Sequence, residues 1–244
     1  MRDYLRLLRP AQWVKNAFVL AAIVFALGDT TQSLDVSLWG RAFAAAGVFC
    51  LLSSAVYAMN DIRDAPRDRL HPVKKFRPVA AGEVSVPAAA ATAAALFVLS
   101  LAGAWVLARD FFFVAAAYAV LQIAYTFCLK RIAVVDVAAI AAGFVLRAVA
   151  GAAATGVPVS KWLLICTFAL ASFLGFCKRR GELVRTAGGE LQTRASLAGY
   201  APEMLDSLVA LSLGVTAAVY LEYTLYPATL HIPGEERSVQ ALPF

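Results

Sequence analysis

The stretch Asn60 to Ser85, NDIRDAPRDRLHPVKKFRPVAAGEVS, is densely charged and lies between two long apolar runs. Its carboxylates Asp61, Asp64 and Asp68 follow one another at offsets of three and four, which places them on one face of an α-helix. Like charges arranged in this way repel, so the cluster predicts a cation above it. Carboxylate oxygens suit Mg²⁺, which binds a few of them together with substrate phosphates.

Basic side chains share this segment with the carboxylates, which indicates phosphate binding next to the metal; they are Arg63, Arg67, Arg69, Lys74, Lys75 and Arg77. Pro66 lacks the amide hydrogen that a helix requires. We therefore expect the helix that carries Asp61 and Asp64 to bend or end there, and Asp68 to approach from a turn. The alternative interpretation is a charged loop that only anchors two membrane spans.

The composition indicates a membrane protein. Hydrophobic residues make up 61% of the 244 residues and charged residues only 16%, and the mean hydropathy is +0.71. This is too apolar for one soluble core of that length. The net charge of +6 is therefore attributed to cytoplasmic loops and not to a nucleic-acid partner.

Apolar runs long enough to cross a bilayer predict seven helical spans, near residues 13–28, 39–59, 87–108, 111–129, 134–154, 161–178 and 204–226. If the N-terminus is cytoplasmic, most basic residues fall on cytoplasmic segments, as the positive-inside rule requires. The opening MRDYLRLLRP is followed by an apolar span without a small-residue cleavage site, so no removable signal peptide is expected. The fold class is an all-α polytopic membrane bundle, one domain over 1–244 with catalytic loops near 60–86 and 178–203.

Further basic residues are candidates for phosphate binding. Arg147 lies within a predicted span, where a cation is expensive and normally faces a partner or a polar cavity. The run Lys178, Arg179 and Arg180 has a single carboxylate nearby, Glu182, and is typical of a phosphate clamp. The alternative explanation is that these cations only set the orientation of the chain in the membrane.

In combination, RPAQWVKN, the Asn-Asp-x-x-Asp-x-x-x-Asp pattern, DRLHPVKKFRPVAAG, VDVAAIAAGFVLRAVAG and CKRRGEL resemble the UbiA-type intramembrane transferases. Within that superfamily they are similar to the decaprenyl-phosphate phosphoribosyltransferase branch, over about Leu7 to Tyr226. The resemblance implies Mg²⁺-dependent transfer of a 5-phosphoribosyl group from phosphoribosyl diphosphate to a polyprenyl phosphate, with release of diphosphate. In the family this is an early step towards a lipid-linked arabinose donor for certain cell walls.

The family fold is a bundle of nine membrane helices, whose cavity opens to the cytoplasm and laterally to lipid. Here Phe244 stands where family members begin their last spans. The resemblance implies a multi-pass protein of the inner (plasma) membrane with cytoplasmic active-site loops, and it is compatible with a homo-oligomer.

The resemblance assigns roles to the residues that match the motifs of the family. The catalytic and metal-binding residues are expected to be Asp61, Asp64 and Asp68. The substrate-binding residues are expected to be Lys15, Asn16, Asn60, Arg63, Arg67, Lys74, Lys75, Arg77, Tyr125, Lys130, Arg147, Lys178, Arg179 and Arg180.

One departure from the wider superfamily separates the candidate functions. A standard prenyltransferase carries a second aspartate-rich motif in the second loop, whereas here Glu182 and Glu190 are the only loop carboxylates before Glu203. The alternative is a UbiA-type prenyltransferase that joins a polyprenyl diphosphate to an aromatic acceptor. A remote alternative is a non-catalytic membrane protein or transporter that binds phosphorylated lipid. Neither His71 nor His231 is placed as a catalytic base, and a phosphate acceptor does not need one.

Overall fold

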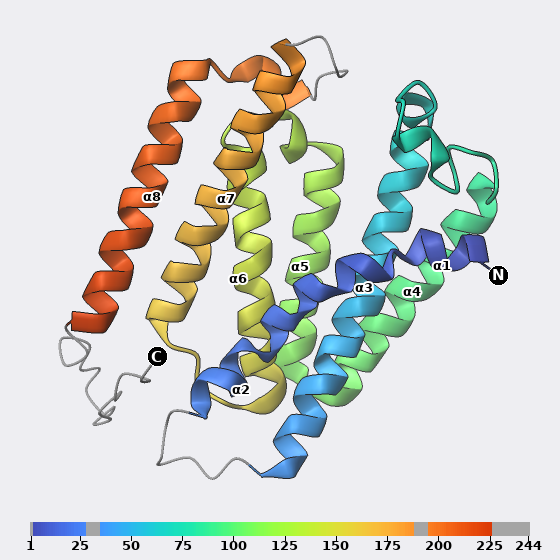
Figure 1. The fold of residues 1–244 in the computed structure, drawn as a ribbon. Helices are drawn as coiled ribbons and strands as arrows, with labels where there is room; N and C mark the ends of the chain where they lie inside the picture. The colour runs from blue at the N-terminus through green and yellow to red at the C-terminus, as the bar shows by residue number, and fades with distance from the viewer. Residues whose placement is uncertain (1, 28–34, 188–194, 226–244) are drawn as a thin grey trace.

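A computed structural model describes residues 2–27, 35–187 and 195–225, and these form helices joined by turns (Figure 1). The chain begins with the short helix α1 (Arg2–Leu8), the 3-10 helix η1 (Pro10–Leu20) and α2 (Ala21–Ala26). The remaining elements are α3 (Val36–Asp68), η2 (Lys74–Phe76), α4 (Val86–Leu107), α5 (Arg109–Phe127), η3 (Leu129–Arg131), α6 (Val135–Thr155), α7 (Lys161–Ala187), η4 (Ala195–Gly199) and α8 (Pro202–Leu225).

Six helices of the described chain, α3 to α8, are long and apolar enough to cross a membrane. They coincide with the last six predicted spans and confirm the all-α polytopic bundle. The outward faces of α4 and α8 expose large apolar side chains, among them Val98, Val106, Leu211 and Leu221. Such faces are expected where a helix contacts lipid instead of a protein core.

The first predicted span, 13–28, takes a composite form in which η1 leads directly into α2. A 3-10 helix rises ~2.0 Å per residue and an α-helix ~1.5 Å, so the two together extend about 31 Å. This segment is not among the six helices of the described chain that are long and apolar enough to cross a membrane. The segment runs obliquely across one face of the bundle (Figure 1) and packs against α3 and α6.

Close approach between η1 and α6 depends on Gly151. A Cβ placed on Gly151 would lie 1.8 Å from the carbonyl oxygen of Val19, which is backbone and cannot rotate away. Val19 itself is completely buried, with Phe49, Ala150 and Ala154 in the same cluster. A glycine at this position therefore sets the distance between the N-terminal segment and the bundle.

We predict that Gly151→Ala separates η1 from α6 and lowers the midpoint of thermal unfolding in detergent. Overpacking of this kind costs about 1–3 kcal/mol or more, because the clash is with backbone. The matched control is Gly47→Ala in α3, where nothing lies within 4 Å of an added Cβ. Equal unfolding temperatures for the two variants would contradict the close approach.

Three charged segments lie at the same end of the bundle: the 69–85 loop, the α5–α6 turn and the top of α7 and α8 (Figure 1). Two boundaries differ from expectation here. Helix α3 continues past Pro66 to Asp68, so Asp68 is the last helical residue and does not lie on a turn. Pro66 removes only one hydrogen bond, within the final turn, where the helix has few further bonds to lose.

Helix α7 likewise extends to Ala187, so the first ten residues of the predicted 178–203 loop are helical. Its sequence there consists mainly of good helix formers, and Arg179 pairs with Glu182 at i,i+3. Residues 188–194 of that loop, with Glu190 and Arg194, lie outside the described chain, as does His231.

Candidate active site

Asp61 is the most deeply buried of the three predicted carboxylates, at 1% exposure. It lies on α3, one turn beyond Tyr57. Its Oδ1 accepts a hydrogen bond from Nη2 of Arg9, and Nη1 of Arg77 lies 3.4 Å away. Its Oδ2 is also buried, and no partner among the described residues reaches it. A buried carboxylate oxygen without a donor is unusual and requires an explanation.

Arg77 joins Asp61 to Asp68. Its Nη1 donates to Oδ2 of Asp68 at 2.6 Å, and Asp68 is buried as well. One guanidinium therefore offsets the repulsion between two carboxylates that lie two helical turns apart on α3. Asp61 and Asp68 thus share a partner on one side of α3, whereas Asp64, predicted on the same face, pairs with Lys130 instead.

The loop that carries Arg77 is fixed by the N-terminal helix. Arg6 on α1 pairs with Glu83 at 2.5 Å and donates to the carbonyl oxygen of Phe76 at 2.6 Å. Leu7 is buried in one cluster with Val79 and Val84. The chain's first helix therefore positions the cation that contacts the carboxylates.

Asp64 has a different partner and a different environment. Nζ of Lys130, in η3, lies 2.8 and 3.1 Å from its two oxygens. The Asp64 side chain is 33% exposed, compared with 1% for Asp61. Lys130, predicted to bind substrate, thus lies next to a predicted metal ligand and comes from a segment 66 residues away.

The donor set fits a hard divalent cation. Within the described residues, no three His, Cys, Asp or Glu side chains already form a cluster close enough to hold a metal. However, the oxygens are carboxylates, Asp61 Oδ2 has no donor, and Asp64 is accessible. The side chains of Arg9, Arg77 and Lys130 now neutralise the charge that Mg²⁺ would neutralise.

Arg147 is buried in the middle of the bundle, at 6% exposure. Its Nε donates to Oδ1 of Asn16 at 3.0 Å, its Nη1 to the carbonyl oxygen of Gly143 at 3.0 Å, and its Nη2 to the hydroxyl of Tyr118 at 2.6 Å. Asn16 is in turn held by Ser53, its Nδ2 lying 3.1 Å from the hydroxyl oxygen. The two predicted residues Asn16 and Arg147 are therefore in direct contact.

The other predicted residues occupy the periphery of this site. Arg63 stacks on the ring of Phe127 at 4.2 Å and donates to its carbonyl oxygen. Exposed side chains are those of Lys15, Arg67 and Lys75, and partly buried ones are those of Asn60, Lys74 and Tyr125. The structure thus brings together Asp61, Asp68 and Arg77, and separately Asp64 and Lys130.

The three cations of α7 point in different directions because they are consecutive on a helix. Arg179 is 1% exposed, and its Nε donates to Oδ2 of Asp136 at 2.7 Å. Arg180 pairs with Asp206 on α8 at 2.6 Å, and Lys178 is exposed. The predicted common clamp is not assembled in this conformation, since two of the cations are committed to carboxylates.

Asp136 ties three elements together at the first turn of α6. Besides Arg179, it accepts hydrogen bonds from Ser196 at 3.0 Å and from the hydroxyl of Tyr200 at 2.8 Å. The Tyr200 oxygen also accepts the amide hydrogen of Val134 at 2.6 Å. Val134 has φ +66°, which is strained for a β-branched residue. Burial raises the pKa of Tyr200, so the hydroxyl stays protonated as the donor to Asp136.

Tyr200→Phe is predicted to destabilise the protein by about 1–3 kcal/mol. The change leaves the partly buried Val134 amide without an acceptor and the buried Asp136 without one donor. Thermal unfolding in detergent measures the effect. The matched control is Tyr220→Phe on the exposed face of α8; if both variants unfold at the wild-type temperature, the hydroxyl does not hold this turn.

His71 stabilises the loop that follows α3. Its Nδ1 accepts the amide hydrogens of Val73 and Lys74 at 3.2 and 3.3 Å, which requires that this nitrogen be unprotonated. Burial, and next the positive charge of Lys74, lower the pKa of His71. The side chain is thus a structural acceptor at neutral pH.

Because its pKa is lowered in the folded state, His71 takes up its proton more readily in the unfolded chain. We therefore predict that stability is full above pH ~6.5 and falls as the pH decreases below that value. The measurement is the unfolding temperature between pH 5 and 8. His71→Asn keeps an acceptor without titrating and should flatten the profile; an unchanged slope would refute the assignment.

Three residues of the site were not predicted from the sequence: Arg9, Tyr118 and Asp136. Arg9 precedes Pro10 and adopts a left-handed backbone conformation, φ +53°, which directs the chain from α1 into η1. The only sequence signal for Asp136 was an acidic residue at the start of an apolar span. Tyr118 carried no signal, because a tyrosine in an apolar run is ordinarily a core residue.

The comparisons with known proteins agree with this architecture. Residues 16–181 match the model of the UbiA prenyltransferase family. A decaprenyl-phosphate phosphoribosyltransferase of Mycobacterium tuberculosis is 41% identical over 219 residues, which cover 90% of this chain and 72% of that protein. A protein of the same name from Mycolicibacterium smegmatis is 37% identical and is matched over 68% of its length, with 88% of this chain.

Among solved structures, a UbiA homologue from Archaeoglobus fulgidus has the same fold. Its form bound to GPP and Mg²⁺ superimposes with a TM-score of 0.70 at 25% identity, covering 92% of this chain and 81% of that one. Its form bound to DMAPP and Mg²⁺ gives a TM-score of 0.75 at 23% identity, covering 95% and 80%. With more than nine tenths of this chain covered in both comparisons, the likeness extends over most of the bundle.

Proposed function

Because the chain belongs to the UbiA prenyltransferase family, and within it to the decaprenyl-phosphate phosphoribosyltransferase branch, we propose that it transfers a 5-phosphoribosyl group from phosphoribosyl diphosphate to a polyprenyl phosphate. Diphosphate is released, and the product is a lipid-linked sugar phosphate of the kind used in cell-wall precursor synthesis. The enzyme is a membrane transferase, and Mg²⁺ is its proposed cofactor.

The observation that carries the proposal is the buried Asp61 carboxylate, with one oxygen lacking a donor and three basic side chains within reach of the same cluster. Asp61 and Asp64, with Asp68 behind Arg77, are the residues that would hold Mg²⁺. When bound there, Mg²⁺ would supply positive charge to offset the charge that builds on diphosphate as its bond to the sugar breaks. The solved homologue bound to Mg²⁺ supports this choice of metal.

Arg9, Arg77 and Lys130 have a second task in this proposal. Their donors are directed at carboxylates in the structure, and the same donors suit phosphate oxygens. An incoming diphosphate offers them new anionic partners when the carboxylates turn to the metal. The basic side chains would thus have anionic partners both with and without substrate.

A general base is not required. The acceptor is a phosphate that is already an anion at neutral pH, and the sugar carbon develops oxocarbenium character as diphosphate leaves. His71 is occupied as a hydrogen-bond acceptor for the loop backbone. The role of the protein is therefore to bind, orient and exclude water.

The aromatic prenyltransferase alternative is disfavoured by the second loop. Glu182 lies at the point where a second acidic motif would begin, and it accepts a hydrogen bond from Arg179 at 3.0 Å. Asp136 is likewise committed to Arg179, Ser196 and Tyr200. Asp136 thereby holds α6 to α7, whereas Glu182 pairs with Arg179 within α7.

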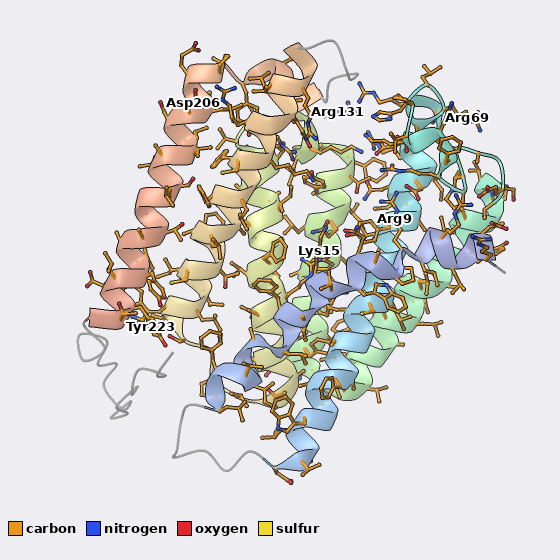
Figure 2. The ribbon with its side chains drawn as sticks, in the orientation of Figure 1. Arg9, Lys15, Arg69, Arg131, Asp206 and Tyr223 are labelled. Atoms are coloured by element: carbon orange, nitrogen blue, oxygen red, sulfur yellow. The ribbon has the colours of Figure 1, made fainter. Side chains whose placement is uncertain are left out.

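The proposed location is the inner (plasma) membrane, with the charged end of the bundle in the cytoplasm. Arg69, Arg131 and Asp206 lie at that end and Tyr223 at the other (Figure 2). The excess of lysine and arginine on the loops of this end agrees with the positive-inside rule. A soluble sugar diphosphate would then reach the carboxylates from the cytoplasm.

The test uses purified protein in detergent or nanodiscs with Mg²⁺, labelled phosphoribosyl diphosphate and decaprenyl phosphate. We predict lipid-soluble label that requires Mg²⁺ and disappears with a chelator. Asp61→Asn should lower the rate by about 10²–10³-fold, the loss typical of one group that stabilises developing charge. Asp110→Asn, an exposed carboxylate at the other end of α5, is the control and should retain the wild-type rate.

The other outcomes select other functions. Product formed only from a prenyl diphosphate and an aromatic acid would establish the aromatic prenyltransferase. Binding of polyprenyl phosphate without turnover of any donor would establish a lipid-binding protein or transporter. Full activity of Asp61→Asn would remove the metal site from the proposed mechanism.

A further inference from the structure

Arg147 is a buried cation to which the described residues offer no carboxylate. Its three hydrogen bonds go to an amide oxygen, a carbonyl oxygen and a hydroxyl, on Asn16, Gly143 and Tyr118. It appears in none of the ion pairs that the described residues form. By contrast, the other deeply buried arginine, Arg179, has both Asp136 and Glu182.

A second basic residue, Lys15, adds positive charge near Arg147. The side chain of Lys15 is exposed and lies within electrostatic range of Arg147 and Arg9, about midway between the two ends of the bundle and farther from the loop end than Arg131 (Figure 2). A membrane-embedded cation normally has an anionic or polar partner that compensates its burial. Arg147 has polar partners but no anionic one, so an anionic group of a ligand would complete its environment.

This cationic position is connected to the carboxylates along one face of α3. Asp61, Tyr57 and Ser53 follow at intervals of four residues; Tyr57 is under Arg9, at 5.2 Å, and Ser53 bonds Asn16, the partner of Arg147. At ~1.5 Å per residue, Ser53 lies about 12 Å deeper along the helix than Asp61. The face between them carries hydroxyl groups and not a hydrocarbon lining.

We propose that Arg147, with Asn16 and Lys15, binds the phosphate monoester at the sugar's 5-position while the diphosphate end is held at Asp61 and Asp64. This rests on the proposed function and specifies its donor site. The donor is a sugar with phosphate groups at both ends, and the structure has two polar sites at different depths on one polar face. The hydroxyls of Tyr57 and Ser53 suit the pentose between them.

The polyprenyl phosphate is the other source of a phosphate group. Its phosphate is attached to a long hydrocarbon chain and prefers the level of the lipid headgroups, near the loop end of the bundle. Reaching Arg147 would require carrying that phosphate about 12 Å below the carboxylates. A soluble donor held at its other end by the carboxylates has no such constraint.

The same geometry gives a basis for selecting against prenyl diphosphates. A prenyl diphosphate anchored at Asp61 would place its hydrocarbon tail against Arg147 and Lys15. The tail offers Arg147 no anionic partner and would cover the exposed Lys15 with apolar atoms, which is unfavourable. A buried arginine at this depth is therefore a specificity-determining residue for a donor that carries a second anion.

The experiment separates the two ends of the donor. Binding of ribose 5-phosphate, and separately of Mg²⁺ with diphosphate, is measured on the whole protein by calorimetry, together with the KM values for donor and lipid. Arg147→Met should weaken ribose 5-phosphate and raise the donor KM by about 10- to 100-fold, the loss of one charge-assisted hydrogen bond. Binding of Mg²⁺ with diphosphate should remain within about twofold of wild type. Arg109→Met, an exposed arginine on α5, is the matched control.

A second variant addresses folding. Asn16→Asp places a carboxylate where Oδ1 now lies, 3.0 Å from Nε of Arg147, and supplies the missing anion from within the protein. We expect an unfolding temperature equal to or above wild type, together with the same weakening of ribose 5-phosphate. A merely structural Arg147 would predict improved stability without any loss of donor binding.

The remaining results are informative in different ways. A raised KM for polyprenyl phosphate with an unchanged donor KM would overturn the inference and assign Arg147 to the lipid, leaving the proposed function intact. Unchanged binding of both fragments would overturn the inference as well. If the wild-type protein makes no product from phosphoribosyl diphosphate, it is the proposed function that fails.

Discussion

The structure depends on the compensation of negative charge at the end of α3. A helix that ends in three carboxylates, with Asp61 and Asp68 buried together and Asp64 paired separately with Lys130, would be unfavourable without nearby cations. Arg9 comes from the N-terminal segment, Arg77 from the following loop and Lys130 from the α5–α6 turn. The carboxylates thus draw three distant parts of the chain to one place, and that place is the proposed metal site.

The composite η1–α2 segment allows this arrangement. Its extended 3-10 geometry carries Arg9 at one end and Asn16 within, so one short stretch contacts both Asp61 and Arg147. Gly151 lets the segment lie directly on α6. At the end of the bundle that holds Asp61, Asp136 binds α6 to α7 and to Tyr200, which follows η4. These contacts support the turn from which Lys130 extends.

The sequence was sufficient for the long helices and for the face shared by Asp61 and Asp68, because apolar length and helical periodicity are local properties. It was not sufficient to predict which side chains far apart in the sequence form ion pairs. Nothing in the sequence links Arg9 to Asp61 across 52 residues, or commits Arg179 to Asp136. The Pro66 prediction was wrong for Asp68, since a proline near a helix end removes a single bond. The charge of Arg147 within a span was visible, but its depth relative to Asp61 required the fold.

The central claim is that the carboxylates of α3 exchange their basic partners for a divalent cation when diphosphate binds. The most direct measurement is a crystal structure with Mn²⁺ and diphosphate, in which anomalous scattering locates the ion. The account predicts a peak within bonding distance of Asp61 and Asp64, with Arg9 and Lys130 moved onto phosphate oxygens. A peak elsewhere, with Asp61 still paired to Arg9 and Asp64 to Lys130, would contradict it.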